Sequence, residues 1–79
     1  MVRRKAPQYG LNKINYLFNH LIYTYRLKND AALCRVLEVQ PAALSKVRHG
    51  ANSLGDSWIL SIHEVFEIPI AEIKEMLNE

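Results

Sequence analysis

The segment 30–50, DAALCRVLEVQPAALSKVRHG, limits the possible fold more than any other part of the chain. Its apolar residues recur at helical spacing on both sides of a short gap, which predicts two short helices joined by a tight turn. The apolar stripe of the first helix consists of Leu33, Val36 and Leu37. Val39 then adds an apolar side chain inside the turn, where it can plug the space between the two helices.

The second helix of this segment has a clear start, a clear end and two distinct faces. Gln40 can cap it, and Pro41 suits its first position because the missing amide hydrogen is not needed there. Leu44 and Val47 bury one face, and Gly50 favours the left-handed backbone that ends a helix. The outer face carries Ala42, Ser45, Lys46 and His49. A short helix with small, polar and basic groups outside suits a DNA major groove, so the segment predicts a helix-turn-helix.

These residues resemble the pattern of the lambda-repressor/Cro-like (XRE-type) family of DNA-binding domains. They match the family's leucine–alanine pair, turn valine, isoleucine–serine pair and closing glycine at Leu33-Cys34, Val39, Leu44-Ser45 with Val47, and Gly50. The resemblance continues over residues 11–77, where the apolar spacing of 58–73 looks like the family's fourth helix and the start of its fifth. It implies a compact five-helix domain that binds double-stranded DNA.

Two features depart from the family pattern. Glu38 stands where the family usually has a glycine, so it must adopt a left-handed backbone at some energetic cost, or the turn must differ. Ala42 and Ala43 stand where polar base-reading residues are common. Direct base contacts are therefore less expected at these two positions.

The sequence before the motif predicts one longer helix. Its apolar stripe consists of Leu11, Ile14, Leu17, Phe18, Leu21 and Tyr25, which is enough for about four turns. Asn29 or Asp30 can cap the first motif helix, because both side chains accept hydrogen bonds from backbone amides.

The sequence after the motif predicts a loop and two more helices. Residues 50–55 are polar and bracketed by glycines, and a fourth helix can start at Ser57, or at Ser53 with Asp56 three residues later. Trp58 is expected to be partly buried or to face a partner, and Pro69 marks the start of a last helix. The fourth helix carries the apolar residues Ile59, Ile62, Val65 and Phe66. We therefore expect an all-α chain, with one lambda-repressor-like helix-turn-helix domain over residues 11–79.

Composition narrows the class of protein. Seventy-nine residues suffice for one domain with a single core, and a hydrophobic content of 49% is that of a globular chain. No apolar run reaches the ~18–20 residues that cross a bilayer, and the single cysteine cannot form an internal disulfide. We expect no membrane partner and a cytoplasmic location, in a bacterial or phage-encoded, nucleoid-associated protein.

The net charge of +2 does not by itself indicate nucleic acid, but the charges are unevenly placed along the chain. Basic residues gather at the start, at Arg3, Arg4 and Lys5, and glutamates crowd the end. A surface that faces DNA needs such an asymmetry. Residues 1–10 are therefore predicted to be a flexible basic arm, which either lies along the duplex or serves as a solubilising tail.

The second motif helix and its surroundings supply the residues expected to contact DNA. Ser45 and Lys46 resemble family residues near base edges, and Lys46 can donate to guanine. His49 is expected at a phosphate or base edge, so DNA binding should weaken as the pH rises. Arg48 can pack its stem and reach a phosphate, and Asn52 either contacts DNA or forms a turn. The full set is Gln40, Pro41, Ala42, Ser45, Lys46, Arg48, His49, Asn52, Arg3, Arg4 and Lys5.

Two surfaces are candidates for contact with a second protein chain. Tyr16 and Tyr23 lie seven residues apart on the outer side of the first helix. The last helix carries more apolar residues than a short terminal helix needs to bury, namely Ile70, Ile73, Met76 and Leu77. The resemblance implies that subunits pair through this region, so we favour the last helix as the surface of a homodimer.

The predicted function is sequence-specific binding of double-stranded DNA by a small Cro/repressor-like transcriptional regulator, with helix 41–49 in the major groove. The alternative is a protein-interaction module on the same scaffold, such as an antitoxin or a repressor-binding partner, with DNA binding secondary or lost. We expect no enzyme, metal, cofactor or small-molecule ligand. Cys34 is better explained as a small buried side chain than as a nucleophile, and the histidines show no metal-ligand spacing.

Overall fold

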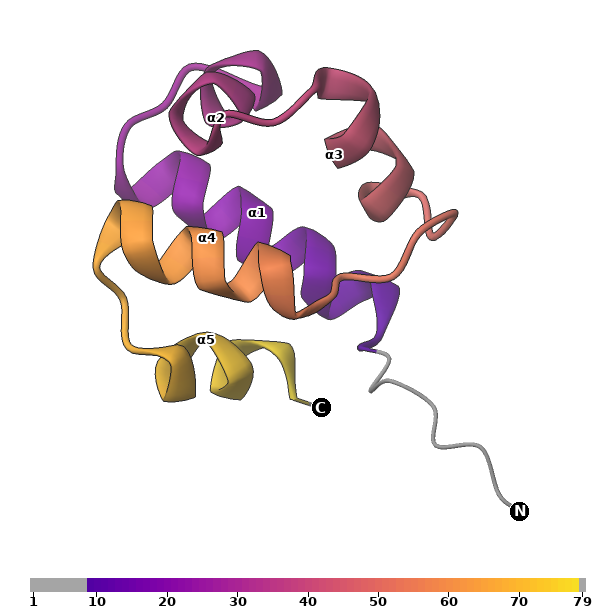
Figure 1. Ribbon diagram of the computed structural model, residues 1–79, viewed down its shortest axis with the longest axis vertical. Helices are drawn as coiled ribbons and strands as arrows, with labels where there is room; N and C mark the ends of the chain where they lie inside the picture. Colours follow the sequence, from indigo (N-terminus) through magenta and orange to yellow (C-terminus); the bar gives the residue numbers. More distant parts are fainter. Residues whose placement is uncertain (1–8, 79) are drawn as a thin grey trace.

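The computed structural model describes residues 9–78, and within this range it contains five helices and no strand. The predicted all-α class is therefore confirmed for this part of the chain. The helices are α1 (Leu11–Thr24), α2 (Asp30–Leu37), α3 (Pro41–Arg48), α4 (Asp56–Phe66) and α5 (Ile70–Leu77). In Figure 1, α1 and α4 cross the middle of the view, with α2 and α3 above them and α5 below.

One hydrophobic core holds the five helices together. Both α1 and α4 pack against α2 and α5, whereas α3 packs against α1 and α2. Phe18 is fully buried, and the ring of Trp58 meets it edge-on with 5.6 Å between the ring centroids. The buried apolar side chains are Ile14, Leu17, Phe18, Leu21, Leu33, Cys34, Leu37, Leu44, Val47, Leu54, Ile59, Ile62, Ile68, Ile73 and Leu77. Removing these side chains from water is the main force that favours the fold.

The helix starts follow the sequence prediction at α2 but not at α4. Asn29 caps α2, because its side chain accepts a hydrogen bond of 3.0 Å from the amide of Ala32. The start predicted for α4 is wrong: Gly55 occupies the capping position, without a side-chain hydrogen bond, and Ser57 already lies in the first turn. Since the helix begins one residue earlier than Ser57, neither serine is placed to cap it.

The turn between α2 and α3 depends on a left-handed glutamate. Glu38 has φ 58° and ψ 46°, so the turn keeps the shape for which glycine is usual and Glu38 bears the cost. The amide of Val39 donates to the carbonyl of Cys34 at 3.0 Å, which closes the end of α2. Val39 is partly buried and packs against the core, as expected from its place in the turn.

Some members of the predicted apolar stripes lie outside the core. Val36 is 37% exposed, because Leu33, Cys34 and Leu37 form the inner face of α2 and Val36 points away from it. Val65 on α4 is also exposed. Leu11 and Tyr25, at the two ends of the α1 stripe, are exposed as well.

Candidate nucleic-acid interface

The outer face of α3 is open, as its sequence predicts. Leu44 and Val47 are both 1% exposed and fix the inner face to the core. The four side chains predicted to face outward are all exposed, namely Ala42, Ser45, Lys46 and His49. In Figure 1, α3 lies at a corner of the molecule, on the side opposite α5. The face is therefore accessible to a ligand as large as a duplex.

Two side chains of this face contact each other. The ring of His49 folds back along the helix, with Nδ1 2.9 Å from the carbonyl oxygen of Ser45 and 3.3 Å from its Oγ. Since a carbonyl oxygen only accepts hydrogen bonds, Nδ1 carries the hydrogen and Nε2 is left for another partner. The side chain of Lys46 forms no hydrogen bond or ion pair with the residues that the structure describes, so its ammonium group need not break such a contact to meet a ligand.

Arg48 does not belong to this open face, because its side chain contacts other parts of the protein. The phosphate contact expected for it stays a prediction. Its guanidinium donates to Oδ1 of Asn15 at 2.6 Å, Oδ1 of Asn19 at 3.0 Å and Oδ1 of Asp30 at 3.0 Å. Nε lies 3.0 Å from Oδ2 of the same aspartate, an ion-pair contact without the angle of a hydrogen bond. With only 14% of its side chain exposed, Arg48 already has protein partners for its charge.

The start of α3 offers few groups for the DNA contacts predicted at Gln40 and Pro41. Gln40 is the residue before the helix, but its side chain makes no capping hydrogen bond. The amides of Ala43 and Leu44 donate to its carbonyl oxygen, and Pro41 has no amide hydrogen, so few amides at this end can hold a phosphate.

The other end of α3 closes through backbone hydrogen bonds. Gly50 has φ 84°, the left-handed conformation predicted for it. The amides of Ala51 and Asn52 then both donate to the carbonyl of Lys46, at 2.9 and 3.2 Å. Asn52 thus takes part in the turn through its backbone while its side chain stays exposed beside α3. The basic residues of the predicted arm, Arg3, Arg4 and Lys5, lie outside the described residues.

The predicted partner surfaces differ in accessibility. Tyr16 is 54% and Tyr23 86% exposed, and Tyr16 stacks on His20 with 6.0 Å between the rings. Ile73 and Leu77, in contrast, are buried in the core, so the interface predicted on the last helix is wrong for these two residues. Their place is explained by the packing of α5 against α1 and α4. Ile70 is exposed and Met76 is partly buried.

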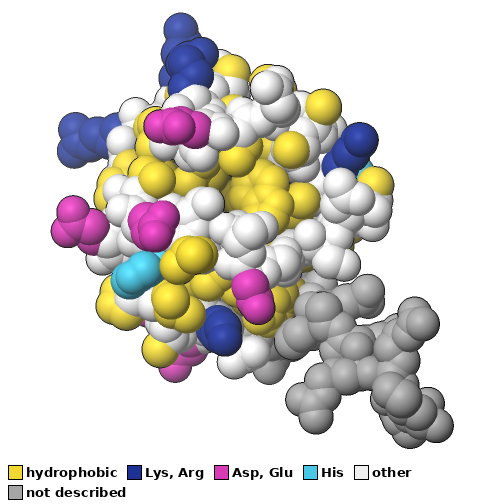
Figure 2. Space-filling model, in the orientation of Figure 1, with side chains coloured by type: hydrophobic (Ala, Val, Ile, Leu, Met, Phe, Trp, Pro, Cys, Tyr) yellow, Lys and Arg dark blue, Asp and Glu magenta, His cyan; other side chains and the backbone are white. Residues whose placement is uncertain are grey.

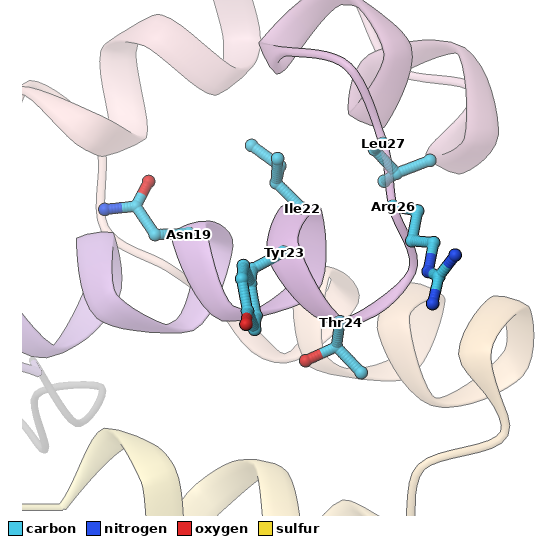
Figure 3. Close-up of a pocket in the computed structure, with 6 residues that line it drawn as sticks. All are labelled: Asn19, Ile22, Tyr23, Thr24, Arg26 and Leu27. Carbon is cyan, nitrogen blue, oxygen red and sulfur yellow. The ribbon is translucent and has the colours of Figure 1, made fainter.

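A surface hollow lies next to Tyr23, at the end of α1 and the turn that follows it. It has a volume of about 830 Å³ and is lined by Asn19, Ile22, Tyr23, Thr24, Arg26 and Leu27. Figure 3 shows these side chains around the last turns of α1. No motif in the sequence pointed to it. The lining contains an aromatic ring, a guanidinium and an amide, which can bind a polar group.

The charges on the face seen in Figure 2 are mixed. Basic side chains lie mostly at its rim, acidic side chains lie both at the rim and within the face, and hydrophobic side chains are exposed among them. This face is therefore not a cationic surface of the kind that follows a phosphate backbone. The exposed lysine of α3 is consequently the most direct basic feature at the candidate interface.

The described residues offer little for chemistry of other kinds. Cys34 is buried, and burial raises the pKa of its thiol; the charge of Asp30 adds to this effect and that of Arg48 opposes it. Within residues 9–78, no three His, Cys, Asp or Glu side chains come together in a group that could hold a metal ion. The same residues include no helix with the length and apolarity needed to cross a bilayer.

Comparisons with known proteins provide no relative. No protein-family model matches the chain, and neither a curated protein nor a solved structure shows significant similarity to it. The likeness to the lambda-repressor/Cro-like family therefore depends on the sequence pattern of residues 11–77, most specifically on segment 30–50.

Proposed function

We propose that this protein binds double-stranded DNA through α3, as a small lambda-repressor/Cro-like transcriptional regulator whose α2 and α3 form a helix-turn-helix. The observation that carries this proposal is the two-sided character of α3. Leu44 and Val47 anchor one face in the core, while the opposite face, with Lys46 at its centre, is exposed. A helix held in this way can enter a groove without losing its contacts to the rest of the domain.

The dimensions and chemistry of α3 support this role. An α-helix with its side chains is about 10–12 Å across, which fits a major groove about 12 Å wide. Lys46 can donate to the acceptors of guanine, Ser45 can donate or accept, and the methyl group of Ala42 can contact that of thymine. Nε2 of His49 can reach a phosphate or a base edge.

We expect modest sequence specificity from such a surface. Few side chains of α3 can read a base, two of them are small, and Arg48 is engaged within the protein. Bridging water and the sequence-dependent shape of the duplex would then contribute to the choice of site. A twofold dimer would place two copies of α3 in successive major grooves, about 34 Å apart, on a palindromic operator.

The proposal is tested by binding to a random-sequence duplex over a range of salt concentrations. We expect nonspecific affinity that falls as salt rises, and Lys46→Met should make this fall less steep, because one cation fewer faces the duplex. Lys74→Met is the matched control, because it removes the same charge from α5, away from α3. Absence of salt-sensitive binding by the unmodified protein would contradict the proposal.

The alternative is a protein-interaction module on the same scaffold, and the exposed aromatic residues favour it. Tyr16 and Tyr23 offer a partner two rings on one side of α1, and Ala42 gives α3 fewer polar groups than a base reader needs. This alternative predicts that Lys46→Met has no effect on binding to the random-sequence duplex. It predicts instead that alanine at both tyrosines abolishes the association with a partner protein.

A further inference from the structure

Arg48, the last residue of α3, contacts two other helices at once. Besides its bonds to α1 and α2, it accepts through its main-chain carbonyl a hydrogen bond of 3.0 Å from Nδ2 of Asn15. Asn15 thus holds the last residue of α3 by both its side chain and its backbone. The guanidinium also lies 5.4 Å from the centre of the Phe18 ring, within the range of a cation–π interaction.

These contacts join the parts of the chain that must be aligned for α3 to present its outer face. Asn15 is 33 residues and Asp30 18 residues away from Arg48 in the sequence. The helix itself has eight residues and buries only Leu44 and Val47, and a helix this short depends on tertiary contacts for its stability and orientation. The apolar contacts hold α3 against the core, whereas the directional bonds of Arg48 fix its rotation and tilt.

We propose that Arg48 is a positioning residue that fixes α3 on α1 and α2, and that its guanidinium does not bind DNA. The second part rests on the proposed function. A guanidinium that left this place for a phosphate would give up three hydrogen bonds, one of them to the carboxylate of Asp30, and the ion-pair contact of Nε with that carboxylate. These charge-assisted bonds are strong, and a phosphate would have to replace all of them, so the contacts within the protein hold the guanidinium in place.

The positioning role is tested without DNA by amide hydrogen exchange. In Arg48→Met we expect the amides of α3 to exchange about tenfold faster, while that of Ile62 in α4 changes less, because local opening of α3 becomes easier. Arg35→Met is the control, since Arg35 is an exposed arginine of α2 outside this network. If Arg48→Met prevents folding, Asp30→Asn gives the same test, because it removes only a half-exposed carboxylate. Unchanged exchange in α3 would overturn the inference.

The DNA affinity of variants at Asp30 and Arg48 distinguishes a positioning role of Arg48 from a phosphate contact. If Arg48 and Asp30 act by positioning α3, Asp30→Asn should weaken DNA binding about fivefold, a typical size for the loss of one coupled contact. The salt slope of DNA binding should not change. A phosphate contact predicts the opposite: removal of the competing carboxylate would tighten binding, and Arg48→Met would reduce the slope by about 0.9. Such a result would overturn the second part of the inference. If the unmodified protein binds no DNA, the proposed function fails, and hydrogen exchange still decides whether Arg48 fixes α3.

Discussion

At the scale of single residues, Glu38 has a left-handed backbone that is energetically unfavourable for a residue with a Cβ atom. Arg26, Glu38 and Glu67 all have φ between 56° and 58°, a region that favours glycine because a Cβ atom crowds the following carbonyl. Glu38 joins α2 to α3, so its conformation sets the angle at which α3 leaves the turn. The sequence identified this position as unusual but left open whether the turn or the residue would adapt.

Glycine at position 38 should therefore stabilise the protein. We expect Glu38→Gly to be more stable than Glu38→Ala by about 1 kcal/mol, because both variants remove the charge but only glycine removes the Cβ atom from a left-handed position. Urea unfolding of the two variants measures this difference. Equal stability would mean that the left-handed backbone costs nothing here.

At the scale of helices, each element has its own source of stability. α2 begins with a side-chain cap, whereas α4 and α5 begin without one and depend on the burial of their apolar faces. α3 has no side-chain cap and buries few residues, so the polar contacts at its last residue matter more than they would in a longer helix.

Removal of the side-chain cap of α2 should lower the stability of the protein by a measurable amount. We expect Asn29→Ala to lower the free energy of unfolding by about 1 kcal/mol, because the amide of Ala32 loses its acceptor. Asn29→Asp is the control, since its carboxylate can accept the same bond. Thermal or urea unfolding checks both; an alanine variant as stable as the aspartate variant would show that water replaces the cap.

At the scale of the whole molecule, the core and any interface between subunits must be formed by different residues. Ile73 and Leu77 belong to the core, and the aromatic and aliphatic side chains left outside include Tyr16, Tyr23 and Ile70. A homodimer must therefore use exposed residues, while α5 serves to close the core over α1 and α4.

Substitutions in α5 should separate these two roles. We expect Ile73→Ala to lower the stability by about 2–5 kcal/mol at every protein concentration, because it leaves a cavity in a buried site. Ile70→Ala, the exposed match on the same helix, should affect stability much less. Urea unfolding at two concentrations, with sedimentation of the folded proteins, provides the readout. A stability loss in Ile73→Ala that disappears at high protein concentration would place Ile73 in an interface after all.

The sequence predicted five helices, a tight turn after the second of them and the two faces of α3, because these features follow from periodicities between residues close in the chain. It located the left-handed Gly50 and the buried Leu44 and Val47 in this way. Asn15 and Asn19 share a face of α1 by their spacing, but no local pattern connects them to Arg48.

The position of the Arg48 charge and the covered side of α5 follow from the packing of the helices and not from any local sequence pattern. The arginine contacts join residues 18 to 33 positions apart, and such pairs form only once three helices have packed together. Likewise, an apolar residue at helical spacing is equally suited to a core or to an interface, and the packing of α1 and α4 over Ile73 settles the choice. Both outcomes depend on which surfaces come into contact, a property of the assembled helices rather than of any one segment.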